Sequence, residues 1–333
     1  MNDSGREYLL IMRNNNATTV LQTKYPLVQA PMSWMTDANL VATVSEAGGL
    51  GVLGLNAGQR DVTSSPEETA NRMRQQIQLV KSKTTKPFGI NIVAPRSGQS
   101  LSDAIFTDAL LQMAYEENVT HFVVVGEAHE ELFKQIKLHD GILIFRPSTP
   151  TIEQAQLAEK LGTDLLVATG SDEGGELPEQ EAGTFTIVPA IVDAVNIPVL
   201  AAGGINDHRG VKAALALGAA GVYIGSRFLV TDESPMADEV KKYVIRSNFD
   251  DLVRVSAIRR SLKTPAALRY ADMYRIDPQK DTETLIRQHG GMRPGMLEAD
   301  FNQGVISVNI GINEINEQSS VAELVESLMT DII

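Results

Sequence analysis

Cysteine is absent from the 333 residues of this chain. Without a thiol, the protein can form no disulfide, thiolate metal site or iron–sulfur cluster, and it has no cysteine nucleophile. Long hydrophobic runs are also missing, since no apolar stretch approaches the ~18 residues of a membrane span. The N-terminal stretch YLLIM is too short for the core of a signal peptide. These absences predict a cytoplasmic protein whose first ~20 residues are frayed.

Positive charge is scarce. The chain has 29 Lys and Arg against 42 Asp and Glu, which gives a net charge of −13. Such a surface repels phosphate backbones and anionic membranes, so we expect a small-molecule substrate rather than nucleic acid or lipid. An anionic ligand would need locally positive groups, such as helix N-termini or a few arginines. No metal site is expected, and a homodimer is left open.

Short apolar segments alternate with helical ones along the first two thirds of the chain. Continuous apolar strands separated by helices predict a parallel sheet covered on both faces, and eight such units favour a closed (β/α)₈ TIM barrel. The strands are expected at 27–30, 50–54, 88–93, 121–125, 142–146, 164–167, 198–201 and 221–224. The helices are expected at 37–47, 66–82, 101–117, 130–137, 152–161, 185–195 and 207–217.

After Val230 the composition changes. Residues 233–300 are richer in charge, show no strand alternation and are typical of helices joined by turns. The end of the chain, SSVAELVESLM, predicts an amphipathic helix with Ser320 as N-cap. We therefore expect a barrel over 1–232, a smaller helical lid or substrate domain over 233–318, and a C-terminal segment, 319–333, whose helix packs back on the barrel.

The ends of the last two barrel strands carry glycine. AAGGI places Ala202, Gly203 and Gly204 at the seventh strand end, and GSRF places Gly225 and Ser226 at the eighth. Bare N–H groups, helix N-termini and a hydroxyl at these two loops predict a phosphate site. A sugar phosphate, a nucleotide or a flavin mononucleotide (FMN) would each satisfy it.

Three other strand ends also face this side of the barrel. Pro31 and Met32 follow the first strand, where a loop could pass under a flat ring, and Asn91 lies near the end of the third. Arg146 ends the fifth strand. A buried arginine must find an anion, either a ligand such as a reduced flavin or a carboxylate such as Asp172.

The stretches QAPMSWMTDANLVATVSEAGGLGVLG, KPFGINI and TFTIVPAIVDAVNIPVLAAGGINDHRGVKAALALGAAGVYIGSRFL resemble the nitronate monooxygenase family. That family includes FMN-dependent enoyl-acyl-carrier-protein reductases. The resemblance covers most of residues 20–235 and implies an FMN-binding TIM barrel beside a smaller helical domain, with NADH or NADPH as a donor.

The resemblance also implies roles for individual residues. Met32 would present backbone to the flavin and Asn91 would contact its ring system, while Arg146 stands where many members have a lysine near the pyrimidine. The phosphate would be held by Gly203, Gly204, Gly225 and Ser226.

The sixth strand end departs from the family. There GSDEGGE, residues 170–176, aligns with glycine-x-glutamate-small-Gly-Gly-His, so Glu176 stands where the family has its active-site histidine. Gly174 and Gly175 would allow close approach to the flavin. Glu176 could remove a proton from a neutral substrate, donate one if burial raised its pKa, or be a solvated loop acid.

The function expected from the sequence is an FMN-dependent oxidoreductase. It would oxidise nitronates or nitroalkanes with O₂, or pass electrons from NAD(P)H to an acceptor such as an enoyl thioester or a quinone. A sugar-phosphate isomerase or synthase is one alternative, and a non-catalytic flavin-binding protein that has lost the family histidine is another. Barrels of the IMP dehydrogenase type are excluded because their mechanism needs a cysteine.

Overall fold

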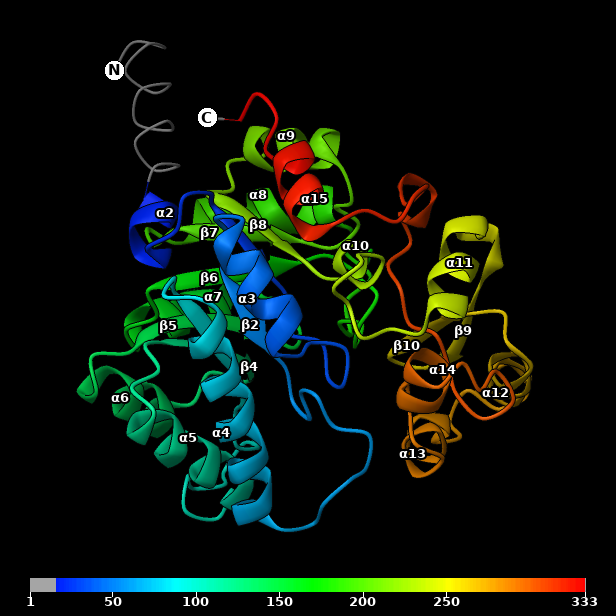
Figure 1. The fold of residues 1–333 in the computed structure, drawn as a ribbon, viewed down its shortest axis with the longest axis horizontal. Coiled ribbons are helices and arrows are strands. Elements are labelled where there is room, and N and C mark those ends of the chain that lie inside the picture. The colour runs from blue at the N-terminus through cyan, green and yellow to red at the C-terminus, as the bar shows by residue number, and fades with distance from the viewer. Residues whose placement is uncertain (1–15, 333) are drawn as a thin grey trace.

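The computed structural model describes residues 16–332, and a ring of eight parallel strands forms its centre (Figure 1). These strands are almost wholly buried because helices cover the outside of the ring. Their bounds are β1 Leu27–Gln29, β2 Gly51–Leu53, β3 Phe88–Val93, β4 His121–Gly126, β5 Ile142–Pro147, β6 Leu165–Thr169, β7 Val199–Ala202 and β8 Gly221–Ile224.

Consecutive strands pair in parallel from β2 to β8, and β8 pairs with β1. A parallel bridge between Val28 and Leu50 joins β1 to the start of β2 and closes the ring. The predicted (β/α)₈ TIM barrel is confirmed.

The helices that cover the barrel follow its strands in order. Several begin with a side chain that accepts first-turn N–H groups, as Asp37, Ser65 and Thr151 do. Their bounds are α3 Ala38–Glu46, α4 Pro66–Lys83, α5 Ile105–Glu116, α6 Glu130–Leu138, α7 Ile152–Lys160, α8 Thr184–Ala194, α9 His208–Ala216 and α10 Ser226–Leu229.

A second group of elements lies beside the barrel, to the right in Figure 1, and is called the cap here. It contains α11 Asp238–Arg246, a short 3₁₀ helix at Phe249–Asp251, β9 Leu252–Ser256, β10 Arg259–Leu262, α12 Pro265–Ile276, α13 Thr282–Gln288 and α14 Arg293–Leu297. Strands β9 and β10 form an antiparallel hairpin. The expectation that this region holds only helices and turns was therefore wrong.

The chain returns from the cap through a 3₁₀ helix, Ile312–Glu314, to α15, Val321–Leu328. Helix α15 packs against α3 and α9, and Ser320 caps it as predicted. The division at 232/233 and 318/319 stays a prediction.

At the other end of the described chain, residues expected to be frayed form helix α2, Asn16–Leu21, in which Ala17 and Leu21 are buried. The rest of that expectation concerns residues 1–15, which lie outside the described part. Among residues 16–332, no helix combines the length and apolar character needed to cross a membrane.

Candidate active site

A cavity of about 600 Å³ lies at the carboxyl ends of the barrel strands, with the cap forming its other wall. This volume falls within the range of roughly 300–1,000 Å³ typical of small-molecule sites. The structure brings together every site residue expected from the sequence. The lining includes Pro31, Met32, Asn91, Arg146, Gly174, Gly175, Glu176, Ala202, Gly203, Gly204, Gly225 and Ser226.

The turn after β7 presents bare backbone to the cavity. Gly203 has φ +104° and Gly204 φ +70°, which are left-handed values that favour glycine. Within residues 16–332, the N–H groups of these two glycines have no hydrogen-bond acceptor. A Cβ on Gly203 would lie 2.8 Å from Thr184 Oγ1 and 2.9 Å from the Gly170 carbonyl oxygen. The turn therefore requires glycine at this position and leaves donors free for an anion.

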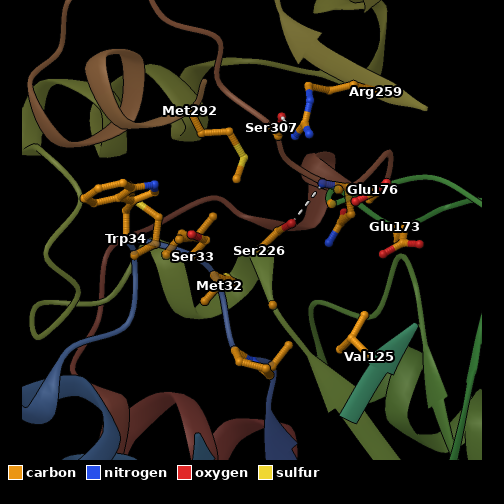
Figure 2. Close-up of a pocket in the computed structure, with 18 of the residues that line it drawn as sticks. Met32, Ser33, Trp34, Val125, Glu173, Glu176, Ser226, Arg259, Met292 and Ser307 are labelled. Carbon is orange, nitrogen blue, oxygen red and sulfur yellow. Dashed lines mark hydrogen bonds between the residues drawn. The ribbon is translucent and has the colours of Figure 1, made fainter. Parts of the chain in front are cut away.

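Ser226, at the end of β8, adds a hydroxyl to the free N–H groups of Gly203 and Gly204. These three groups are called the cradle here. Ser226 Oγ accepts a hydrogen bond from the Asn309 N–H at 2.9 Å, which leaves the hydroxyl proton free to be donated (Figure 2). Asn309 is held in turn by two side-chain hydrogen bonds with Asn206, at 2.8 and 3.0 Å. Asn309 belongs to the segment between α14 and α15, which is called the returning segment here. This segment thus orients the Ser226 hydroxyl.

The helix N-termini contribute less to the cradle than expected. Asp207 caps α9 and accepts the N–H groups of Arg209 and Gly210, so its carboxylate already uses those donors. Helix α10, after β8, has only four residues. The donors left free for an anion are the glycine N–H groups and the Ser226 hydroxyl rather than helix N-termini.

Arg146 and Glu173 form a buried ion pair in the cavity wall. Arg146 Nη2 donates to Glu173 Oε2 at 2.5 Å, and the two side chains are 10% and 12% exposed. Burial raises the pKa of Glu173, although the Arg146 charge acts in the opposite direction. The expectation of a carboxylate partner for Arg146 is met by Glu173 and not by Asp172. Asp172 instead accepts the Thr184 N–H at 2.6 Å.

The cap clamps the loop that carries these acids. The Arg260 guanidinium donates to the carbonyl oxygens of Ser171 and Glu173, and the Leu177 N–H donates to Ile258 O at 2.8 Å. Gly174 has no room for a side chain, because a Cβ would lie 2.3 Å from the Val308 carbonyl carbon. The lack of a side chain at Gly174 thus allows the backbone of Val308 to pack against the loop that follows β6.

Glu176 occupies the rim of the cavity. Its side chain is 53% exposed, and Oε1 lies 3.6 Å from Arg287 Nη2 on α13. Arg287 Nε also donates to Glu283 Oε1 at 2.9 Å, and Glu283 pairs with Arg259 at 2.6 Å. Burial alone would raise the pKa of Glu283, but hydrogen bonds from Arg259 and its charge lower it to about 2.

Several lining residues were not predicted from the sequence. Trp34, the single tryptophan of the chain, and Met292 line the cavity. Figure 2 places Ser226 between the Met32–Trp34 segment and the two acids Glu173 and Glu176. Nine further members come from the cap and the returning segment, and no sequence pattern linked them to the strand ends. They are Arg259, Glu283, Ile286, Arg287, Gly290, Gly291, Met296, Ser307 and Asn309.

Among residues 16–332, no histidine lines the cavity. His121 begins β4 at the opposite end of the barrel and its Nε2 lies 3.0 Å from Leu21 O. His208 is the first residue of α9 and lies outside the lining. The described part of the lining therefore holds no imidazole that could take the role of the histidine expected at position 176.

Comparison with known proteins agrees with this geometry. The family model described as nitronate monooxygenase matches residues 14–331. The chain belongs to the nitronate monooxygenase family. A probable nitronate monooxygenase of Staphylococcus haemolyticus is 34% identical, over 72% of this chain and 74% of that protein.

Two further relatives match over nearly the whole chain. One is the (3aS,4S,5R,7aS)-5-hydroxy-7a-methyl-1-oxo-octahydro-1H-indene-4-carboxyl-CoA dehydrogenase of Mycobacterium tuberculosis, 28% identical over 95% of both chains. The other is the solved structure of FabK from Thermotoga maritima, 30% identical with a TM-score of 0.82 over 94% of both chains. Monooxygenase and dehydrogenase are names of oxidoreductases, and flavin binding is typical of this family.

The members of the cavity wall fit such a cofactor. The buried atoms Thr169 Oγ1 and Glu173 Oε1 belong to lining residues and have no hydrogen-bond partner among residues 16–332. Buried polar atoms of this kind are usually satisfied, so a ligand with a polar ring edge would complete them. The free N–H groups of Gly203 and Gly204 offer the matching donors for its phosphate.

Proposed function

We propose that this protein is an FMN-dependent oxidoreductase that takes electrons from NADH or NADPH and passes them to a small-molecule acceptor. The observation that carries the proposal is the convergence of two features on one cavity. These are the free hydrogen-bond donors at the ends of β7 and β8, which suit a phosphate, and a cation, Arg146, near the end of β5. Bound FMN would supply hydride and electron transfer between donor and acceptor.

The residues of the chain would bind and orient the cofactor. Gly203 and Gly204 N–H groups and the Ser226 hydroxyl would hold the phosphate, while Met32 and Asn91 would lie along the ring system. Arg146 would face the pyrimidine edge with part of its charge neutralised by Glu173, which lies 2.5 Å away. The cap would cover this site and exclude water from it.

An enoyl thioester or a quinone is the acceptor class that we place first. By the sequence resemblance, Glu176 stands where the family has its active-site histidine. Glu176 is half exposed and faces Arg287 at the rim, so we expect no counterpart of the family's imidazole here. Oxidation of nitronates or nitroalkanes with O₂ is the second candidate. The 34% identity to a probable nitronate monooxygenase favours it.

An acceptor panel tests the proposal. After anaerobic reduction by NADH or NADPH, the bound flavin should be reoxidised by enoyl thioesters or quinones. Anaerobic reduction of the oxidised flavin by a nitronate, followed by reoxidation with O₂, would favour the second candidate, because a nitronate is the electron donor in that reaction. A yellow protein whose flavin stays oxidised with both nicotinamides would instead be a non-catalytic flavin-binding protein.

A further inference from the structure

Arginines gather on the cap side of the cavity, in a chain whose net charge is −13. The β9–β10 hairpin carries Arg254, Arg259 and Arg260, and α13 carries Arg287. Arg259 and Arg287 line the cavity. Because most of the surface repels anions, these guanidinium groups offer the local positive charge that an anionic substrate would need.

The two lining arginines differ in how far they are committed to protein partners. The Arg259 side chain is 9% exposed, and its Nε and Nη2 donate to Glu283 at 3.0 and 2.6 Å. The Arg287 side chain is 59% exposed and donates to Glu283 through Nε. Its Nη2 lies 3.6 Å from Glu176, which is too long for a hydrogen bond. The outer edge of the Arg287 fork is therefore available at the rim.

We propose that Arg287 anchors a phosphate group of the substrate at the mouth of the cavity, and that Glu176 is the counter-charge which this phosphate replaces. Glu283 fixes the inner edge of the guanidinium, so its remaining donors are pre-positioned for bidentate binding of a phosphate. Displacing Glu176 costs little, because its carboxylate is half exposed and returns to water.

The inference rests on the proposed function only for the identity of the phosphate carrier. Nicotinamide dinucleotides and coenzyme A thioesters both carry phosphate groups outside their reacting atoms. The same anchor would serve either one, and the choice between them is left to measurement.

Loss of the Arg287 charge and loss of the Glu176 charge should change the affinity for the phosphate carrier in opposite directions. Removing the Arg287 charge takes away the attraction, whereas removing the Glu176 charge takes away a competitor for Arg287 and a repulsion of the phosphate. A rim pair with a purely structural role would loosen in the same way from either side. Opposite signs are therefore the signature of phosphate anchoring.

Calorimetric titration of the full-length protein as purified measures this directly, with NAD⁺, NADP⁺ and coenzyme A as ligands that undergo no turnover. For the carrier that uses the anchor, Arg287→Gln should weaken binding about five- to tenfold, and Glu176→Gln should tighten it about two- to threefold. Arg275→Gln is the matched control, because Arg275 on α12 is 74% exposed and pairs with Asp272. It should leave every affinity unchanged.

The pattern across the three ligands identifies the carrier. Effects on NAD⁺ and NADP⁺ alone assign the anchor to the nicotinamide donor, and effects on coenzyme A alone assign it to a thioester. Changes of the same sign in both variants, or no change for any ligand, would overturn the proposal. So would an equal loss of kcat with every acceptor in Glu176→Gln, since that result makes Glu176 an acid–base group.

Failure of the proposed function gives a different result. If neither nicotinamide reduces the flavin while the opposite-sign pattern persists, the anchor stands and the oxidoreductase assignment falls.

Discussion

The barrel and the cap face the same cavity with different chemical groups. At the ends of β7 and β8, the barrel presents the backbone of Gly203 and Gly204 and the hydroxyl of Ser226. The cap presents Arg259 and Arg287, charged side chains held by carboxylates. Backbone donors are set by the fold itself, whereas charged side chains change by substitution. Under the proposed function, the barrel would bind the cofactor and the cap would select the substrate.

The largest expected effect comes from a substitution in the glycine turn at the end of β7. Gly203→Ala should weaken FMN binding more than about 100-fold, because the new Cβ strains a positive φ and displaces a free N–H donor. FMN binding can be followed by quenching of the fluorescence of Trp34, the single tryptophan, which lines the cavity.

Gly98→Ala is the matched control for Gly203→Ala. Gly98 also has a positive φ, +76°, but a Cβ there would meet nothing within 4 Å. This variant should carry the same kind of φ strain without the steric clash, and it should keep its FMN affinity. Equal FMN affinities in the two alanine variants would show that the Gly203 turn does not bind the phosphate of FMN.

The next effect belongs to the cap. Glu283→Gln should lower the free energy of unfolding in urea by about 3 kcal/mol, because Arg259 is left buried without its counter-charge. Asp272→Asn, which removes one partner of an exposed pair, should change it by less than about 0.5 kcal/mol. A loss of FMN affinity as large as that of Gly203→Ala would contradict the separation between cap and barrel.

Acid should remove the stability that Glu283 provides. Its pKa is lowered from an ordinary 4.5 to about 2 in the folded protein. Between these values the unfolded chain binds more protons than the folded one, so this stability is complete above pH 4.5 and is lost as the pH falls toward 2. The difference in unfolding free energy between wild type and Glu283→Gln should therefore shrink from about pH 5 downward. A constant difference would show that the Glu283 carboxylate is not the cause.

The smallest expected effect sharpens the contrast between two acids on one loop. Glu173→Gln should raise the reduction potential of bound flavin, because the nearby Arg146 charge then favours the anionic reduced form without compensation. Glu176→Gln should shift it much less, because Glu176 pairs with Arg287 at the rim. Spectroelectrochemical titration of both variants gives the comparison, and equal shifts would mean that burial does not separate their roles.

The barrel could be predicted from the sequence because each of its strands is a short apolar run that must be buried on both faces. Phe88–Val93 and Gly221–Ile224 have the predicted bounds, and the other strands differ by one or two residues at one or both ends. The glycine pair at the end of β7 could be predicted as well, since its positive φ values and bare N–H groups are local properties of glycine.

The cap could not be predicted in the same way. Two arginines of the β9–β10 hairpin have partners that lie far away in the sequence. Arg259 pairs with Glu283, and Arg260 donates to the Ser171 carbonyl oxygen. A local reading of the sequence cannot show these partners. The partner of Arg146 could not be predicted for the same reason. Asp172 already accepts the Thr184 N–H, and Glu173 is therefore the carboxylate that pairs with Arg146.

Anaerobic mixing of the purified protein with NADH and with NADPH tests the central claim most directly. We expect a yellow protein with FMN bound in a 1:1 ratio, and loss of the flavin's visible absorbance with at least one of the two nicotinamides. Absence of bound flavin, together with no quenching of Trp34 fluorescence on addition of FMN, would contradict the cofactor assignment. A flavin that stays oxidised with both donors would contradict the proposed reaction.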